Sequence, residues 1–239
     1  MPDRLIQKLA LRDRLSIEER RVLSGIVART VVVPKGEDLV REGATPTESK
    51  ILQSGFAARY KLLQNGKRQI TALHVIGDFV DLQSLVIKPM DHAILALTDC
   101  TVGAVPHEIL RGITERYPHL TRMLMLNIAL DGAIHRQWLV MTGRPSAGSR
   151  FAHLVCELFV RLQAVGQTQD NSFHLPVTQG ELSDVLGLST VHVNRTLQIL
   201  RANELLVWRN GEVEILDWQR LCEVAEFDPT YLNLHNEPR

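Results

Sequence analysis

The chain has 239 residues, 45% of them hydrophobic and 23% charged, a balance that excludes a disordered or fibrous protein. The 27 Lys and Arg residues equal the 27 Asp and Glu residues in number, so bulk charge gives no reason to expect a polyanionic partner. No apolar run approaches the roughly 20 residues that a membrane-spanning helix requires, and charges near the N-terminus argue against a signal peptide. We therefore expect a cytoplasmic protein that makes no contact with membranes.

The three cysteines, Cys100, Cys156 and Cys222, lie more than 50 residues apart. Their odd number and wide spacing fit neither a disulfide framework nor a zinc or iron–sulfur site, and they are consistent with a reducing cytoplasm. Cys100 lies in an apolar strand pattern, which predicts a buried thiol rather than a sensor.

Charge and residue type both change near the middle of the chain. Residues 1–143 carry 19 basic and 15 acidic side chains, whereas residues 144–239 carry 8 and 12, and all eight cations there are arginines. The stretch 31–105 is rich in β-branched residues and glycine turns, and the chain after it is mostly helical in pattern. We therefore divide the chain near Gly143.

The first half predicts two short helices followed by strands. The first helix is expected over 4–14, and a second starts at Ser16, where Glu19 completes a capping box. Apolar residues then alternate in short runs at 31–40, 49–63, 67–76 and 92–105. The turn dipeptides between the runs are Lys35-Gly36, Glu42-Gly43, Asn65-Gly66 and Gly77-Asp78. This pattern predicts a small antiparallel sandwich or roll.

A helix about 36 Å long is expected from Pro118 to Met141. Its first half is apolar on all sides, so one neighbouring sheet cannot cover it. Burial between its own roll and the same helix of a second subunit predicts a two-fold dimer, and burial inside a single monomer is the alternative. Gly143-Arg144-Pro145 ends the helix and is a natural hinge, and a further helix is expected over 146–164.

Two short helices joined by a tight turn come next in the chain. Thr178 and Glu181 form a capping box, and Gly187 ends the first helix in a position that favours the left-handed conformation. Ser189 caps the second helix. The facing sides of the two helices carry the apolar residues Leu182, Val185, Leu186, Val193, Leu197 and Leu200, a pattern typical of a helix-turn-helix.

The outer face of the second helix has no carboxylate and consists of Thr190, Val191, Asn194, Arg195 and Gln198. Such a face suits the DNA major groove, where arginine pairs with guanine and asparagine with adenine, and His192 at its edge could reach a phosphate. Residues 206–215, with an Asn210-Gly211 turn, predict the hairpin wing of a winged helix. The alternative is a helical pair that binds no nucleic acid, with a solvated Arg195.

With these residues, the chain resembles the Crp/Fnr family of bacterial transcription regulators over nearly its whole length. The most specific match is 178–201, where Gly187, Val193, Arg195 and Leu197 occupy the signature positions. The resemblance implies an α+β fold with an N-terminal antiparallel, cyclic-nucleotide-binding-like β-roll, a long dimerisation helix and a C-terminal winged helix-turn-helix. It also implies a homodimer that binds palindromic double-stranded DNA and contacts RNA polymerase.

The match to the roll is looser and rests on Gly36, Gly55, Gly66 and the Gly77-Asp78-Phe79 turn. In the cyclic-AMP-binding members, a Gly-Glu and an Arg-Ser pair hold the ribose and the phosphate, and here Asp81-Leu82 and Met90-Asp91 take those places. The phosphate would lose its arginine and meet the carboxylate of Asp91, which would repel it, so cyclic AMP is not the expected effector. The positions that contact the base align with His135 and Arg136, and an arginine one turn earlier becomes Asp131.

Two other cofactors of related regulators receive little support. No cysteine precedes Cys100, which excludes the N-terminal iron–sulfur cluster of the oxygen-sensing relatives. His74 and His92 lie in the roll and could serve a haem, but ordinary core or surface histidines explain them better. The best-known members have a glutamate that reads cytosine where Val191 stands, so the half-site should differ from theirs.

These observations predict four segments: N-terminal helices and effector-binding roll at 1–117, a dimerisation helix at 118–143, a winged helix-turn-helix at 144–228 and a tail at 229–239. The expected DNA-binding residues are Thr178, Gln179, Ser189, Thr190, Val191, His192, Asn194 and Arg195. The expected effector pocket comprises Gly77, Asp78, Asp81, Leu82, Met90, Asp91, His92, Asp131 and His135.

The function expected from these features is transcription regulation under the control of a small-molecule effector that the sequence does not identify. The alternative is a signalling module whose winged helix serves protein interaction. An enzyme is not expected, because the sequence contains no nucleophile elbow, phosphate loop or metal-ligand spacing.

Overall fold

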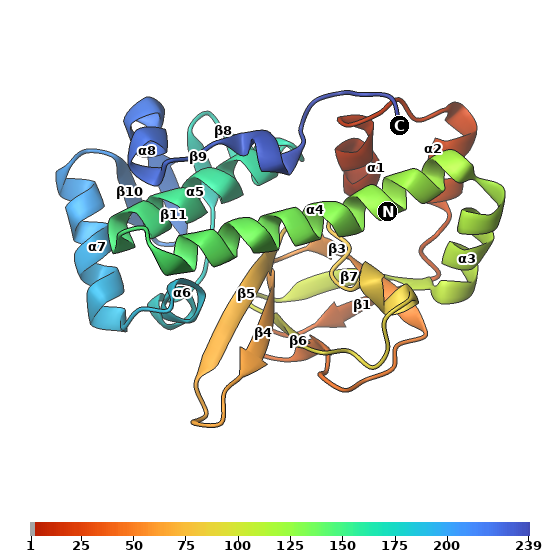
Figure 1. The fold of residues 1–239 in the computed structure, drawn as a ribbon, viewed down its shortest axis with the longest axis horizontal. Helices are drawn as coiled ribbons and strands as arrows, with labels where there is room; N and C mark the ends of the chain where they lie inside the picture. The colour runs from red at the N-terminus through yellow and green to blue at the C-terminus, as the bar shows by residue number, and fades with distance from the viewer. Residues whose placement is uncertain (1–2) are drawn as a thin grey trace. The chain divides into compact units, whose positions relative to one another are not determined.

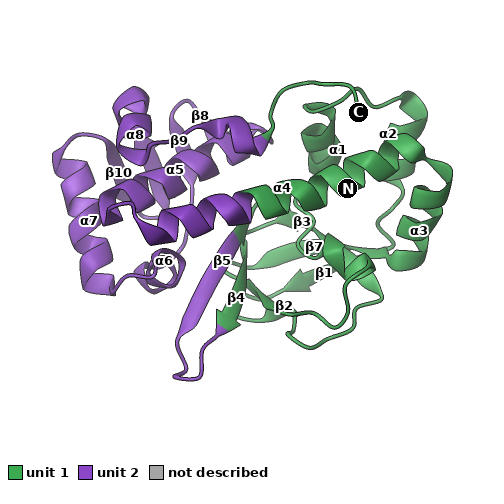
Figure 2. Cartoon of the chain, in the orientation of Figure 1, with its two compact units in different colours: residues 1–61, 73–133, 233–239 green, residues 62–72, 134–232 purple. Residues whose placement is uncertain are grey.

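A computed structural model describes residues 3–239, shown in Figure 1. The chain forms two compact units, coloured separately in Figure 2. The first contains the residues up to Lys61, Leu73–Ala133 and Asn233–Arg239, and the second contains Leu62–Ala72 and Ile134–Leu232. The long helix α4 (Pro118–Gly143) gives its first part to the first unit and its last part to the second.

The alternating segments of the first half form the expected antiparallel roll. One sheet has the order β1-β7-β3 and the other the order β2-β6-β4-β5. The strands are β1 (Arg29–Val33), β2 (Asp38–Val40), β3 (Glu48–Ser54), β4 (Ala57–Leu62), β5 (Arg68–His74), β6 (Ala93–Ala96) and β7 (Cys100–Pro106). Strands β1 and β7 pair from Arg29↔Ala104 to Val33↔Cys100, and Cys100 is buried as expected.

The predicted turn glycines set the strand boundaries. Gly36, Gly43, Gly66 and Gly77 all have positive φ, a region that side-chain-bearing residues rarely adopt. At Gly77 space is also limiting, because an added Cβ would lie 2.9 Å from the backbone of Arg4. These turns make the chain reverse where the alternating pattern breaks.

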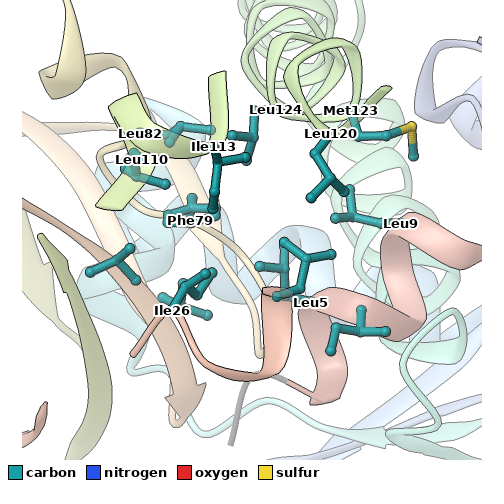
Figure 3. Packing of buried hydrophobic residues seen from close by; sticks show 14 of the residues in the cluster. Leu5, Leu9, Ile26, Phe79, Leu82, Leu110, Ile113, Leu120, Met123 and Leu124 are labelled. Carbon is teal, nitrogen blue, oxygen red and sulfur yellow. The ribbon is translucent and has the colours of Figure 1, made fainter. Parts of the chain in front are cut away.

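Helices supply most residues of one apolar cluster of the first unit, to which β3 and β7 also contribute. The helices are α1 (Asp3–Ala10), α2 (Ile17–Ser24), the 3₁₀ helix η1 (Leu82–Leu85), α3 (His107–Arg116) and the start of α4. Figure 3 shows Leu5 and Leu9 of α1 with Leu110 and Ile113 of α3, near Leu120 at the start of α4. The buried side of α4 is thus covered by helices as well as by the roll.

The capping box at Ser16 is confirmed, since the hydroxyl of Ser16 accepts from the N–H of Glu19 and the Glu19 carboxylate accepts from the N–H of Ser16. The first helix, however, ends at Ala10 and not near Arg14. The N–H of Arg12 donates to the carbonyl of Leu9 at 2.9 Å, which tightens the last turn. The N–H of Arg14 donates to Asp13 Oδ1 instead of to a helix carbonyl.

The second unit is built around α5 (Ala147–Gln163), close to the expected range 146–164, and Ser146 caps its N-terminus. Around it lie α6 (Gln179–Leu186), α7 (Thr190–Ala202), α8 (Trp218–Ala225) and the 3₁₀ helix η2 (Pro229–Leu232). The carboxylate of Glu157 is fully buried and accepts hydrogen bonds from Trp138 Nε1, Arg161 Nη1 and Tyr231 Oη. This network joins the end of α4 to α5 and to η2.

The wing is larger than the predicted hairpin. Strands β10 (Leu206–Arg209) and β11 (Glu212–Ile215) pair around Asn210 and Gly211, both with positive φ, as the Asn-Gly turn predicted. Two further short strands, β8 (Thr168–Gln169) and β9 (Ser172–His174), extend the sheet in the order β10-β11-β9-β8.

The C-terminal segment 233–239 belongs to the first unit. Glu237 N–H donates to the carbonyl of Arg12, and Arg239 N–H donates to Asp13 Oδ2 at 2.6 Å. No helix within residues 3–239 is both long enough and apolar enough to span a membrane.

Candidate nucleic-acid interface and effector region

Helices α6 and α7 form the predicted helix-turn-helix. The hydroxyl of Thr178 accepts from Glu181 N–H, and the Glu181 carboxylate accepts from Thr178 N–H at 2.6 Å, so the capping box is complete. Gly187 ends α6 with φ 65°. Ser189 then caps α7 through the N–H of His192. The chain therefore reverses within three residues, as local capping chemistry dictates.

The inner faces of the two helices carry the expected core with one difference. Leu182, Val185 and Leu186 of α6 are buried, and so are Val193 and Leu200 of α7. Leu197 is only half-buried, and Thr196 lies in the core in its place. Thr196 tolerates burial because its hydroxyl donates to the carbonyl of His192 one turn earlier.

The outer face of α7 is open, and the whole helix contains no acidic residue. Val191 is 77% exposed, Thr190, His192 and Arg195 are also exposed, and Asn194 is half-buried. The amide of Asn194 donates to Gln179 Oε1 of α6 at 2.8 Å. The eight expected DNA-binding residues thus lie on α6 and α7 or at their N-terminal caps.

The residues expected at the effector pocket separate into two groups. The turn residues Gly77 and Asp78 lie against helix α1. The backbone of Gly77 passes close to Arg4, and Asp78 pairs with Lys8 and accepts a hydrogen bond from the N–H of Val75. Leu82 is buried in the helical cluster of Figure 3. Asp78 thus connects the turn to α1, and Leu82 packs η1 into the same cluster as α1.

Asp81 is fully buried, and its Oδ1 accepts from the N–H of Lys50 on β3 at 2.6 Å. Its Oδ2 has no hydrogen-bond partner, and the ammonium of Lys50 lies 3.9 Å away. Burial raises the pKa of Asp81 to about 6 although Lys50 opposes the rise. Asp81 is therefore a buried side chain that accepts a hydrogen bond from the backbone of β3.

A second group comes together around His92. Met90 is buried, Asp91 is exposed, and His92 is buried between Asp91 Oδ1 at 2.8 Å and Gln83 Nε2 at 3.2 Å. Burial and the nearby charge of Arg59 lower the pKa of His92. The pKa of Asp91 is lowered as well, because the pairing with His92 outweighs the opposing effect of burial.

Arg59 of β4 links this group to the long helix. Its guanidinium is 2.7 Å from Asp131 Oδ2 of α4, and its side chain is largely buried. Sequence reasoning missed Arg59, although a lone cation within the apolar run 56–60 was an available signal. His135 is exposed on the part of α4 that belongs to the second unit. Among residues 3–239, no three His, Cys, Asp or Glu side chains form a group that could hold a metal ion.

Comparisons with known proteins agree with this architecture. Residues 30–117 match the model of the cyclic nucleotide-binding domain, and residues 149–224 match the Crp-like helix-turn-helix domain. The chain belongs to the Crp/Fnr family of transcription regulators.

Full-length relatives support the assignment. The transcriptional activator protein Anr of Pseudomonas protegens is 29% identical over 211 residues, which cover 88% of this chain and 86% of that protein. The fumarate and nitrate reduction regulatory protein of Vibrio cholerae is 25% identical over 220 residues, 92% and 88% of the two chains. The structure of FixK2 from Bradyrhizobium japonicum superimposes with a TM-score of 0.74 at 25% identity, covering 83% of this chain and 97% of that one.

As a Crp/Fnr regulator, the protein carries its helix-turn-helix as a DNA-binding domain and is not an enzyme. The α+β fold expected from the resemblance is confirmed. In the roll, Asp81 is a buried carboxylate, Leu82 and Met90 are buried apolar side chains, and Asp91 is an exposed carboxylate.

Proposed function

We propose that the protein is a sequence-specific DNA-binding regulator that acts as a homodimer on a palindromic promoter site. The observation that carries the proposal is the open, carboxylate-free outer face of α7, on which Arg195 is exposed and Asn194 is half-buried. Contacts to DNA come from Thr178, Gln179, Ser189, Thr190, Val191, His192, Asn194 and Arg195.

Within this face the residues have different roles. Arg195 pairs with guanine in each half-site, since a guanidinium can donate to both guanine acceptors in the major groove. Val191 has no hydrogen-bonding side chain and contacts a thymine methyl instead of reading cytosine. His192 lies beside the N-terminus of α7 and contacts a phosphate.

The homodimer is supported by an apolar face of α4. Met125 is 63% exposed and Leu139 is 69% exposed, and Ile128 and Val140 are exposed too. Alternating steps of three and four residues give the heptad spacing of a helix pair: Met125, Ile128, Gly132, His135 and Leu139. A second copy of α4 covers this face in a two-fold dimer, which places two recognition helices on a palindrome.

Control of DNA binding is proposed to involve an effector other than cyclic AMP. Leu82 and Met90 are buried and cannot hydrogen-bond a ribose or a phosphate, and the exposed carboxylate of Asp91 would repel the phosphate. The group of Arg59, Asp91, His92 and Asp131 joins β4 to α4 and is the proposed place where an effector acts. A contact with RNA polymerase is proposed by resemblance to the family.

Selection of bound sequences from a random duplex pool, with and without candidate metabolites, tests the DNA-binding proposal. The expected product is a palindrome whose affinity falls steeply with salt, because phosphate contacts release counterions. Enrichment of no sequence under any condition would contradict the proposal and favour a protein-interaction role for the winged helix.

Light scattering and calorimetry test the other two parts. The expected mass is about twice 26.9 kDa. Met125→Glu should yield monomers. Val86→Glu changes an exposed apolar residue at the C-terminal end of η1, outside α4, and should remain dimeric. A monomeric mass for the wild-type protein would contradict the proposed dimer. Titration with cyclic AMP should give no heat at micromolar concentrations, and micromolar affinity would show that the assignment of the pocket is wrong.

A further inference from the structure

The front of the helix-turn-helix carries a hydrogen-bonded pair of amides. Asn194 lies in the second turn of α7, and Gln179 is the first residue of α6. Asn194 Nδ2 donates to Gln179 Oε1 at 2.8 Å. Within residues 3–239, neither side-chain amide makes another hydrogen bond. The pair therefore joins the two helices on the side that stays open to solvent.

This contact restricts the orientation of the Asn194 amide. The terminal torsion of asparagine is broad, so an isolated Asn194 would sample many amide orientations. Gln179 comes directly after Thr178, whose capping box fixes the start of α6. Gln179 thus offers its carbonyl from a well-positioned backbone and holds the amino group of Asn194 toward α6.

Once the bond to Gln179 is made, Asn194 retains Oδ1 as an acceptor and one N–H as a donor. In the major groove, adenine presents N7 as an acceptor and the N6 amino group as a donor, which is the pattern an asparagine amide complements. Guanine presents two acceptors and suits an arginine instead. The neighbouring Arg195 provides that group on the same exposed face.

We infer that Asn194 reads one adenine in each half-site and that Gln179 is a positioning residue that orients the Asn194 amide for it. The inference rests on the proposed DNA-binding function and adds a base and a role to it. In addition to the DNA contact proposed for it above, Gln179 acts on base discrimination through Asn194, so its loss changes discrimination at the base pair that Asn194 reads and at no other.

The test uses the full-length protein and the operator obtained by selection, with each base pair of one half-site replaced in turn. Wild type should prefer adenine at one position by about 5- to 150-fold, the factor that corresponds to a good bidentate contact. Asn194→Ala should abolish the preference at that position. Gln179→Ala should reduce it by about 2- to 12-fold, the factor expected for one hydrogen bond.

Three further variants separate positioning from a direct contact. Gln179→Glu keeps the acceptor for Asn194 Nδ2 and should retain the preference for adenine, although its charge lowers affinity for every sequence. The double variant Gln179→Ala/Asn194→Ala should discriminate no worse than Asn194→Ala alone. Gln219→Ala removes an exposed amide on α8 and should match wild type.

Three results would overturn the inference. A Gln179→Ala variant with affinity lowered equally at all positions would make Gln179 a backbone contact only. An effect of Gln179→Ala on a base pair that Asn194→Ala leaves intact, or loss of adenine preference in Gln179→Glu, would also contradict it. If wild type selects a palindrome and one of these results is obtained, the inference alone fails; if wild type selects no sequence, the proposed function fails with it.

Discussion

Asp81, a fully buried carboxylate of the first unit, offers a test of how burial links the pKa of a side chain to the stability of the protein. In the folded protein burial raises its pKa from 3.8 to about 6, and Oδ2 is left without a hydrogen bond. The folded state therefore binds the proton more tightly than the unfolded state. Stability from this group is present at low pH and is lost as the pH rises through 6.

The expected magnitude comes from that pKa change. At about 1.36 kcal/mol per pKa unit, the rise to about 6 corresponds to roughly 3 kcal/mol between strongly acidic and neutral solution. About 2 kcal/mol of this falls between pH 4.5 and pH 7.5. Asp81→Asn keeps the acceptor for Lys50 N–H and cannot ionise. The free energy of unfolding of Asp81→Asn relative to that of wild type should therefore rise by about 2 kcal/mol from pH 4.5 to pH 7.5.

Urea unfolding of both proteins at a series of pH values measures this difference, and other titrating groups cancel in it. Asp170→Asn, at an exposed turn, controls for the loss of one negative charge. A constant difference between wild type and Asp81→Asn from pH 4.5 to pH 7.5 would refute the claim that burial raises the pKa of Asp81.

Three further predictions concern the helix-turn-helix and the N-terminal helices. Arg195→Ala should cost about 1–3 kcal/mol per half-site on the selected operator and relax preference at one guanine, measured by equilibrium binding, and an unchanged preference would contradict the groove-facing position of α7. Gly187→Ala should destabilise the protein by about 1 kcal/mol in thermal unfolding because φ is 65° there, and Gly187→Asn should cost less; equal stability of all three proteins would show that the turn is not strained. His119 contacts both Asp13 and Glu19. Burial opposes the shift, but hydrogen bonds from the backbone of Arg14 to Asp13 and of Ser16 to Glu19, followed by those of His119, lower the pKa values of both carboxylates, so the stability that these bonds give is lost as the pH falls below about 4. His119→Gln should cost about 1 kcal/mol at pH 7 and less in acid by urea unfolding, and a cost that grows in acid would contradict this sign.

The helix-turn-helix was largely predictable because its signals are local. Thr178, Gly187 and Ser189 fix the helix ends through groups at most four residues away. The Asn210-Gly211 turn likewise fixes the wing hairpin within its own few residues. In the roll, glycine turns and alternation located the strands for the same reason.

Contacts between residues distant in sequence were not predictable. Arg59 pairs with Asp131, and Asp13 accepts a hydrogen bond from the N–H of Arg239. Strands β8 and β9 are two and three residues long, too short to show a period of two.

The sequence by itself therefore determined the capped ends of the helix-turn-helix, the turns of the roll and of the wing, and which face of α7 is open, because backbone preferences, caps and turns act within a few residues. Tertiary structure alone decided that Asp81 is buried, that Arg59 joins β4 to α4, and that Asn194 donates a hydrogen bond to Gln179. Those pairings depend on how whole elements pack, and packing brings together side chains whose partners lie 15 to 72 residues away in the chain.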